Sequence, residues 1–190
     1  GQSRQLRFNP DAPSLKKALP NVEINVAAIA KGYGIDAMAK VLADAGIENY
    51  LVEVGGDLVT EGKNDKGTPW RIGIETPEAG LQGSVQRVIG LSGHGMATSG
   101  DYRNFFERDG ERYSHLLDPN TGRPVTHATT SATVLAENAM LADAWATAML
   151  VLGVERGLAV AERHGVAVFF ISRDRQAQSP TYILQESSAF

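Results

Sequence analysis

A carboxylate and a hydroxyl lie one helical turn apart in an otherwise apolar segment of the chain. Asp143 and Thr147 belong to residues 141–149, whose other members are Ala, Leu, Met and Trp. On a helix, this spacing places both side chains on one face. An unpaired carboxylate in apolar surroundings is costly, and a Mg²⁺ ion bound by carboxylate and hydroxyl oxygens is one remedy. The alternative is structural: Thr147 bonds to the carbonyl four residues before it, and Asp143 complements the dipole at the helix start.

Three short glycine-containing segments have the composition of phosphate-binding loops. They contain Lys31 next to Gly32, the pair Gly55 and Gly56 after an apolar run, and Thr98, Ser99 and Gly100 followed by Arg103. Glycine lets backbone amides approach a phosphate closely, and arginine offers a planar fork of N–H donors. None of these segments matches a P-loop or a dinucleotide-binding fingerprint. The alternatives are a turn or bulge between strands at the glycine pair, and a helix start capped by Ser99 or Asp101 in the third segment.

His115 lies between a predicted strand and the turn predicted over residues 118–122. A histidine at the end of a strand is placed to act as a general base, since its ordinary pKa lies near neutral pH. The alternative is a histidine that satisfies only a local hydrogen bond. The other histidines of the chain have no comparable surroundings.

Hydrophobic periodicity and turn residues predict an α+β domain. Met38 and Val41 belong to a set near a 3.6-residue period, which predicts a helix over residues 27–45 that ends at Gly46. Further helices are expected over residues 138–152 and 155–164, and strands over residues 21–26, 50–54, 70–75, 85–89, 111–117, 129–135 and 166–171. Helices interrupt these strands without strict alternation, which is typical of a mostly antiparallel sheet flanked by helices. Residues 1–18, which contain a charged and proline-bearing stretch, are expected to be a connecting segment, and residues 19–190 the domain.

Composition limits the classes of function. With 190 residues, 43% hydrophobic and 21% charged, the chain has the composition of an ordinary globular domain. A formal net charge of −4 argues against nucleic acid as a partner, and the absence of cysteine excludes disulfides, thiolate nucleophiles and cysteine-ligated metals. The first residues lack the apolar stretch of a signal peptide, and residues 139–154 are short for a membrane span and contain Asp143. We therefore expect no membrane span, and a chain whose upstream part has been removed.

Several segments, in their order and spacing, resemble the FAD:protein FMN transferases, the ApbE-like family once called thiamine-biosynthesis lipoproteins. They are AIAKGY at residues 28–33, VGGD at 54–57, ATSGDYR at 97–103, YSHLLDPNTG at 113–122 and ADAWAT at 142–147. The resemblance extends from residue 19 to residue 174, which is most of the chain. It implies the α+β fold of that family.

The resemblance also implies a Mg²⁺-dependent activity. Members of the family cleave the pyrophosphate of FAD, transfer the FMN half to a threonine hydroxyl of an acceptor redox protein, and release AMP. By resemblance, the metal ligands are the side chains of Asp143 and Thr147 and the carbonyl of Ala28. Asp143 is then essential for catalysis, and His115 takes or positions the proton of the acceptor hydroxyl. The residues that would line the FAD site are Lys31, Gly55, Gly56, Thr98, Ser99, Gly100 and Arg103.

The chain departs from the family pattern, and other functions fit the same residues. Asn25 stands where the family usually has Asp. Family members extend upstream, and that part supplies a lipoprotein-type export signal and part of the isoalloxazine pocket, which implies a periplasmic location and a lipid anchor. One alternative is a Mg²⁺-dependent FAD pyrophosphatase, in which water attacks and FMN and AMP are released. Another is a non-catalytic FAD-binding module, which would not require Asp143, Thr147 and His115 together.

Overall fold

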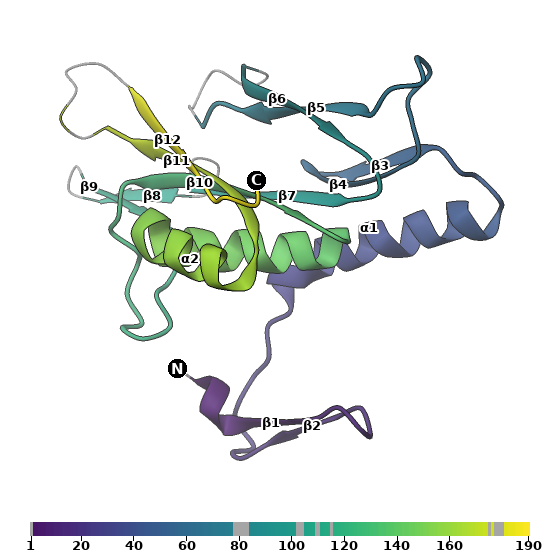
Figure 1. The fold of residues 1–190 in the computed structure, drawn as a ribbon. Coiled ribbons are helices and arrows are strands. Elements are labelled where there is room, and N and C mark those ends of the chain that lie inside the picture. Colours follow the sequence, from purple (N-terminus) through teal and green to yellow (C-terminus); the bar gives the residue numbers. More distant parts are fainter. Residues whose placement is uncertain are drawn as a thin grey trace.

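A six-stranded antiparallel sheet lies at the centre of the fold (Figure 1). The computed structural model describes residues 2–77, 84–101, 105–108, 111–114, 116–174, 176 and 181–190. The strand order is β12-β11-β10-β7-β4-β3, and every neighbouring pair is antiparallel. The strands are β3 (Tyr50–Val54), β4 (Asp57–Glu61), β7 (Gly95–Gly100), β10 (Thr129–Ala136), β11 (Ala167–Arg173) and β12 (Tyr182–Glu186). This sheet, with its flanking helices, confirms the expected α+β class.

Two helices, α1 (Ala27–Asp44) and α2 (Ala139–His164), cover one face of this sheet (Figure 1). α2 is capped at its start by Asn138, whose side chain accepts a hydrogen bond from the Leu141 N–H at 2.9 Å. Many of its buried residues are alanine or glycine, so the helix approaches β7 and β10 closely. The core between α2 and the sheet includes Val134, Ala142, Ala146, Met149, Leu150, Val168 and Phe170.

α1 turns a different face toward the core from the one that its periodicity predicts. Its buried residues are Gly32, Ile35 and Ala39. On the predicted face, Met38 and Val41 are 43% and 67% exposed. The reason is the closeness of the two helices, because a Cβ at Gly32 would lie 2.3 Å from the Ala139 carbonyl oxygen. Only glycine permits this contact, so α1 meets α2 through a small residue and not through the periodic apolar residues.

A separate hairpin, β5 (Trp70–Glu75) and β6 (Val85–Leu91), covers the opposite face of the sheet (Figure 1). Ile72 of β5 and Leu91 of β6 form an apolar cluster with Met96 of β7. The alternation of apolar and polar residues predicted both strands, and the structure confirms them. The fold therefore has three layers, with the helices, the central sheet and this hairpin stacked in that order.

α2 contains a break at Gly153, whose backbone angles of φ 71° and ψ 171° are not helical. The helices predicted over residues 138–152 and 155–164 are therefore the two halves of one element. A Cβ at Gly153 would lie 2.6 Å from a ring carbon of His127. Both the left-handed φ and this close approach require glycine at the break.

By length and composition, α2 is the one helix of the described residues that is long and apolar enough to cross a membrane. A core helix of a globular domain has the same length and composition, and α2 packs against α1, β7 and β10. We describe it as the central helix of the core.

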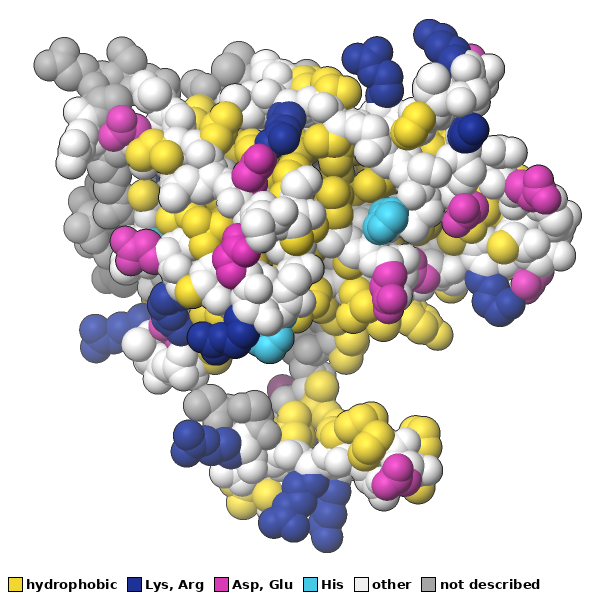
Figure 2. All heavy atoms as spheres, viewed as in Figure 1, with side chains coloured by type: hydrophobic (Ala, Val, Ile, Leu, Met, Phe, Trp, Pro, Cys, Tyr) yellow, Lys and Arg dark blue, Asp and Glu magenta, His cyan; other side chains and the backbone are white. Residues whose placement is uncertain are grey.

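Residues 2–17, expected to belong to a connecting segment, have secondary structure of their own. They form the 3-10 helix η1 (Gln2–Gln5) and a hairpin of β1 (Leu6–Asn9) and β2 (Ser14–Lys17). In Figure 1 this hairpin lies apart from the three layers. Phe8 and Leu15, which are paired across the hairpin, are 69% and 48% exposed, and basic side chains lie beside the apolar ones (Figure 2).

The strand expected over residues 21–26 is absent from this described segment. The Lys17 ammonium instead donates hydrogen bonds to the carbonyls of Pro20 and Val22, at 2.9 and 2.8 Å. Asn25 then accepts a hydrogen bond from the Ala27 N–H at 2.8 Å, which turns the chain into α1. These local contacts compete with strand pairing and explain the error.

Two other predicted segments differ in detail. The strand expected over residues 111–117 is shorter: β9 (Glu111–Ser114) pairs with β8 (Phe105–Arg108), and Leu117 instead forms an isolated bridge with Pro124. The segment around Thr98 is neither a loop nor a helix start, because it forms strand β7 between β4 and β10. Its small polar residues gave no strand-like alternation of apolar side chains.

Asp36 of α1 fixes the start of α2. Its carboxylate oxygens accept hydrogen bonds from the N–H groups of Ala139 and Met140, at 2.8 and 2.9 Å. We expect Asp36→Ala to lower the free energy of unfolding by about 1–3 kcal/mol, because two N–H groups lose their acceptor. Urea denaturation measures this change. The control is Asp44→Ala on the exposed part of α1, which is expected to change stability by less than about 0.5 kcal/mol; equal losses in both variants would contradict this role of Asp36.

Candidate active site

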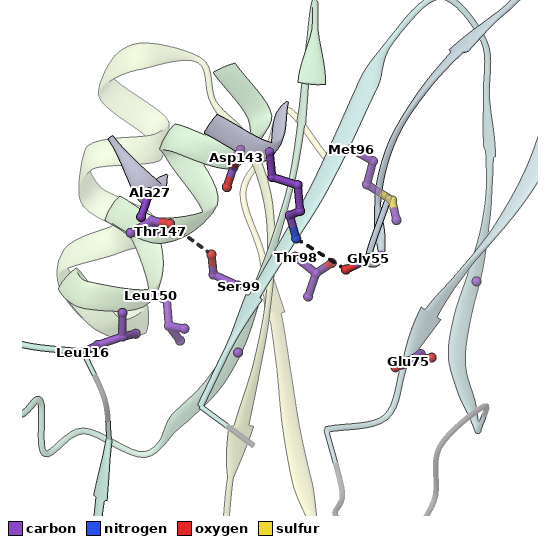
Figure 3. A pocket seen from close by; sticks show the side chains of 14 residues that line it. Ala27, Gly55, Glu75, Met96, Thr98, Ser99, Leu116, Asp143, Thr147 and Leu150 are labelled. Atoms are coloured by element: carbon purple, nitrogen blue, oxygen red, sulfur yellow. Dashed lines mark hydrogen bonds between the residues drawn. The ribbon is translucent and has the colours of Figure 1, made fainter. Parts of the chain in front are cut away.

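A cavity of about 390 Å³ lies between α1, α2, β5, β7 and the turn that joins β3 to β4 (Figure 3). The predicted site residues that line it are Lys31, Gly55, Gly56, Thr98, Ser99, Gly100, Asp143 and Thr147. The lining residues that sequence reasoning missed are Ala27, Gly73, Glu75, Met96, Leu116 and Leu150. Most of these missed residues offer only backbone or apolar atoms, so their types gave no chemical signal. The fold thus brings residues of all three predicted phosphate-binding segments and the two side chains predicted to bind metal, Asp143 and Thr147, to one cavity.

Asp143 is a buried carboxylate on the first half of α2, with 6% of its surface exposed. Its Oδ2 accepts a hydrogen bond from the Gly32 N–H of α1 at 3.1 Å. Burial raises the pKa of the Asp143 carboxyl above its ordinary value, although the Gly32 N–H and the positive charge of Lys31 oppose this rise. Among the described residues, no cationic side chain forms an ion pair with Asp143. A buried and incompletely compensated carboxylate of this kind is suited to bind a cation.

Thr147 lies one turn after Asp143 and also faces the cavity (Figure 3). Its Oγ1 lies 3.3 Å from the Ser99 Oγ of β7. This contact directs the Thr147 hydroxyl toward β7, at the wall of the cavity. The structure therefore brings together the two side chains that the sequence proposed as metal ligands.

Ala28, the third proposed ligand, lies in the first turn of α1, where the residue that lines the cavity is Ala27. In a regular helix the Ala28 carbonyl pairs with the Gly32 N–H. In this structure the Gly32 N–H donates to Asp143 Oδ2, which places the first turn of α1 beside that carboxylate. The role of Ala28 stays a prediction.

The donor atoms at this place suit Mg²⁺. Within the described ranges, no group of three or more His, Asp or Glu side chains could hold a metal ion. A cation beside Asp143 would therefore take one carboxylate, one hydroxyl and further oxygens from backbone, water or substrate. Mg²⁺ is bound in this way, through one or two carboxylates plus waters and phosphates, whereas zinc prefers nitrogen and sulfur ligands.

Lys31 supplies a positive charge at the wall of the cavity. Its ammonium forms an ion pair with Asp57 at 2.8 Å and a hydrogen bond to the Gly55 carbonyl at 3.3 Å, which is drawn in Figure 3. Gly55 and Gly56 form the two-residue turn between β3 and β4, with φ values of 59° and 93°. Left-handed φ values at both positions are typical of such a hairpin turn and favour glycine. The alternative of a turn between strands is therefore confirmed, and the turn also lines the cavity.

Asp57 is a buried carboxylate beside the cavity that sequence reasoning did not select, although it belongs to the VGGD segment. Asp57 is 2% exposed and forms an ion pair with Lys31. Its carboxylate also accepts a hydrogen bond from the Thr98 N–H at 3.2 Å. Burial raises the pKa of its carboxyl, while Lys31 lowers it and the negative charge of Asp143 adds to the rise. Asp57 is absent from the residues that line the cavity. It supports the wall from behind.

Two predicted residues, His115 and Arg103, lie outside the described residues. Their roles stay predictions. Leu116, which follows His115 in the chain, is described and lines the cavity.

A family model and the curated relatives of this chain point to the same family. The model of the ApbE family matches residues 2–170. An FAD:protein FMN transferase of Haemophilus influenzae is 43% identical over 185 residues, which are 97% of this chain and 52% of that protein. Its counterpart in Vibrio cholerae is 49% identical over 158 residues, which are 83% of this chain and 47% of that protein. The chain spans about half the length of the curated relatives it matches.

Solved structures show the same fold. The apo form of the flavinyl transferase ApbE of Pseudomonas stutzeri has a TM-score of 0.82 and 41% sequence identity, and the match covers 98% of this chain and 55% of that one. The flavin transferase ApbE of Vibrio cholerae has a TM-score of 0.83 and 42% identity, covering 98% and 57%. At these values, both the sequence and the arrangement of elements agree over nearly the whole chain described here.

Proposed function

Because this chain belongs to the ApbE family, we propose that it carries the metal and pyrophosphate site of an enzyme that transfers FMN from FAD to a threonine of an acceptor protein. The observation that supports this proposal most is the cavity in which Asp143 and Thr147 face Lys31 and the glycine turn of β3 and β4. A pyrophosphate requires positive charge and N–H donors, and a metal ion requires oxygen ligands. The cavity offers both.

In this proposal, Asp143, Thr147 and the Ala28 carbonyl hold a Mg²⁺ ion. When bound, Mg²⁺ neutralises the charge of the pyrophosphate and stabilises the AMP leaving group. Lys31, which also lines the cavity, would pair with a phosphate oxygen and so help to orient the pyrophosphate. The Gly56 N–H donates to the Glu53 carboxylate at 2.6 Å, so the Gly55 amide is the donor of this turn that we propose for the same group.

The proposed step is a single displacement at phosphorus. The threonine oxygen of the acceptor forms a bond to the phosphorus of the FMN half, and the bond from that phosphorus to the bridging oxygen breaks. The electron pair of the broken bond leaves with AMP. His115 would accept the proton of the hydroxyl, because an unassisted threonine is a poor nucleophile at neutral pH.

Mass spectrometry distinguishes transfer from the two alternatives. The full-length protein is incubated with FAD, Mg²⁺ and an acceptor domain that carries the target threonine. An acceptor that gains one FMN, with AMP released, supports transfer. Free FMN and AMP with an unmodified acceptor would instead identify a pyrophosphatase, and intact FAD would identify a binding module.

The affinity for Mg²⁺ is expected to fall as the pH is lowered from neutral to about pH 4, the ordinary pKa of an aspartate. Protons compete with the metal for Asp143, and burial raises the pKa of this carboxyl, so protonation begins at a higher pH than for an exposed aspartate. Below that pKa, the affinity is expected to drop by up to about tenfold per pH unit. Isothermal titration of the metal measures this. A constant affinity across the range would exclude Asp143 as a ligand.

A further inference from the structure

We propose that Asp57 is a positioning residue that holds the Lys31 ammonium away from Asp143 and thereby leaves the Asp143 carboxylate free for a divalent cation. The inference rests on the proposed function, because it takes Asp143 as the ligand of the metal. It adds a role for a carboxylate that touches neither the metal nor the substrate.

The position of Lys31 in the chain makes Asp143 its natural competitor for an ion pair. Lys31 directly precedes Gly32, whose N–H donates to Asp143 Oδ2 at 3.1 Å. The lysine backbone is therefore next to the carboxylate, and its long flexible side chain can reach it. Lys31 and Asp143 are both described by the structure, yet the ion pair that Lys31 forms is with Asp57, at 2.8 Å. Asp57 thus determines the direction of the side chain.

The surroundings of Asp57 suit this role. It is 2% exposed and lies behind the cavity wall, so it influences the site through its charge and through the groups that it contacts. Those groups are the Lys31 ammonium and the Thr98 N–H. The Gly55 carbonyl, at 3.3 Å from the ammonium, fixes the side chain from the same side. The Asp57 carboxylate therefore connects Lys31 of α1 to Thr98 of β7 and directs the Lys31 ammonium toward the glycine turn.

The charges of the three residues affect one another, which is what the proposal requires. Lys31 lowers the pKa of both carboxyls, and the charge of Asp143 raises that of Asp57. If Asp57 became neutral, Asp143 would be the one charged carboxylate left among these three residues to pair with the Lys31 ammonium. Lys31 would then turn toward Asp143 and compete with the metal.

Mg²⁺ binding by four forms of the full chain tests the proposal. The forms are the unchanged protein, Asp57→Asn, Lys31→Met and the double variant, and the metal alone is titrated by calorimetry. Asparagine has the shape of aspartate and keeps an oxygen for the Thr98 N–H. We expect Asp57→Asn to weaken Mg²⁺ binding by about tenfold, and Lys31→Met to bind at least as tightly as the unchanged protein. We also expect the double variant to recover the affinity of Lys31→Met, because the competitor is gone.

The control is another lysine–aspartate ion pair, which lies entirely on α1 and has the same N–O distance as the pair of Lys31 and Asp57. Lys40 and Asp44 are 2.8 Å apart but exposed and outside the cavity, so Asp44→Asn is expected to leave Mg²⁺ binding unchanged. An Asp57→Asn variant that binds Mg²⁺ as the unchanged protein does would overturn the inference alone. A double variant as weak as Asp57→Asn would also overturn it, because Asp57 would then act by supporting the wall. Failure of the unchanged protein to bind Mg²⁺ would overturn the proposed function as well.

Discussion

Asp143→Asn is expected to lower the rate of Mg²⁺-dependent FMN transfer by about a thousandfold. Asp143 is the one carboxylate among the proposed ligands, and the amide of asparagine binds Mg²⁺ far more weakly. The substitution keeps the shape of the side chain and an oxygen that accepts the Gly32 N–H. The rate is measured as FMN attached to the acceptor domain over time, at saturating FAD.

The stability of this variant separates a chemical effect from unfolding. Burial raises the pKa of Asp143, so the ionised carboxylate destabilises the metal-free fold at any pH above that raised value. Asparagine removes this cost, and we expect the metal-free variant to unfold at the same temperature as the unchanged protein or higher. Asp44→Asn, the same change at an exposed site of α1, is expected to leave the rate unchanged. Full Mg²⁺-dependent transfer by Asp143→Asn would show that the metal is held elsewhere.

Gly32→Ala is expected to lower both stability and activity. The added Cβ would lie 2.3 Å from the Ala139 carbonyl oxygen, so α1 and α2 must move apart. We expect the free energy of unfolding to fall by about 1–3 kcal/mol, as is common for overpacked cores. The same movement lengthens the hydrogen bond from residue 32 to Asp143 and displaces Lys31, and a displacement of about 1 Å at a site can reduce a rate roughly a hundredfold. Urea denaturation and the transfer assay measure the two effects.

Gly34 provides the matched control for this substitution. It lies on the same helix, and a Cβ there would have no neighbouring atom within 4 Å. Gly34→Ala is therefore expected to raise the free energy of unfolding by about 0.5–1 kcal/mol through helix propensity, with activity retained. Equal behaviour of the two variants would mean that the contact between the helices does not position the site.

Elements with strong local signals were predictable from the sequence. The helix that ends before Gly46, the alternating strands β5 and β6, the Thr- and Val-containing strand β10 and the apolar strand β11 all have local patterns that depend only on neighbouring residues. The placement of Asp143 and Thr147 on one face of a helix was also predictable from their spacing of four residues. Residues that meet on one element can be found by their spacing.

The remaining features depend on contacts between distant parts of the chain. Gly32 and Asp143 are 111 positions apart, and Asp36 and Ala139 are 103 apart, so no local pattern marks either contact. The same holds for the buried face of α1, which is set by the approach of α2 and contradicts the apolar periodicity. Asp57 lies in a segment that resembles the family, but only the fold shows that its partner is Lys31.

The break at Gly153 makes the two ends of α2 separate targets for protein engineering. The stretch before the break is clamped by Asp36 and carries Asp143, so its orientation is tied to the chemistry. The stretch after it contributes Gly157 and Ala161 to the interior but no side chain to the cavity. Substitutions after the break are therefore expected to change thermal stability and leave the catalytic rate unchanged. Substitutions before the break are expected to change both.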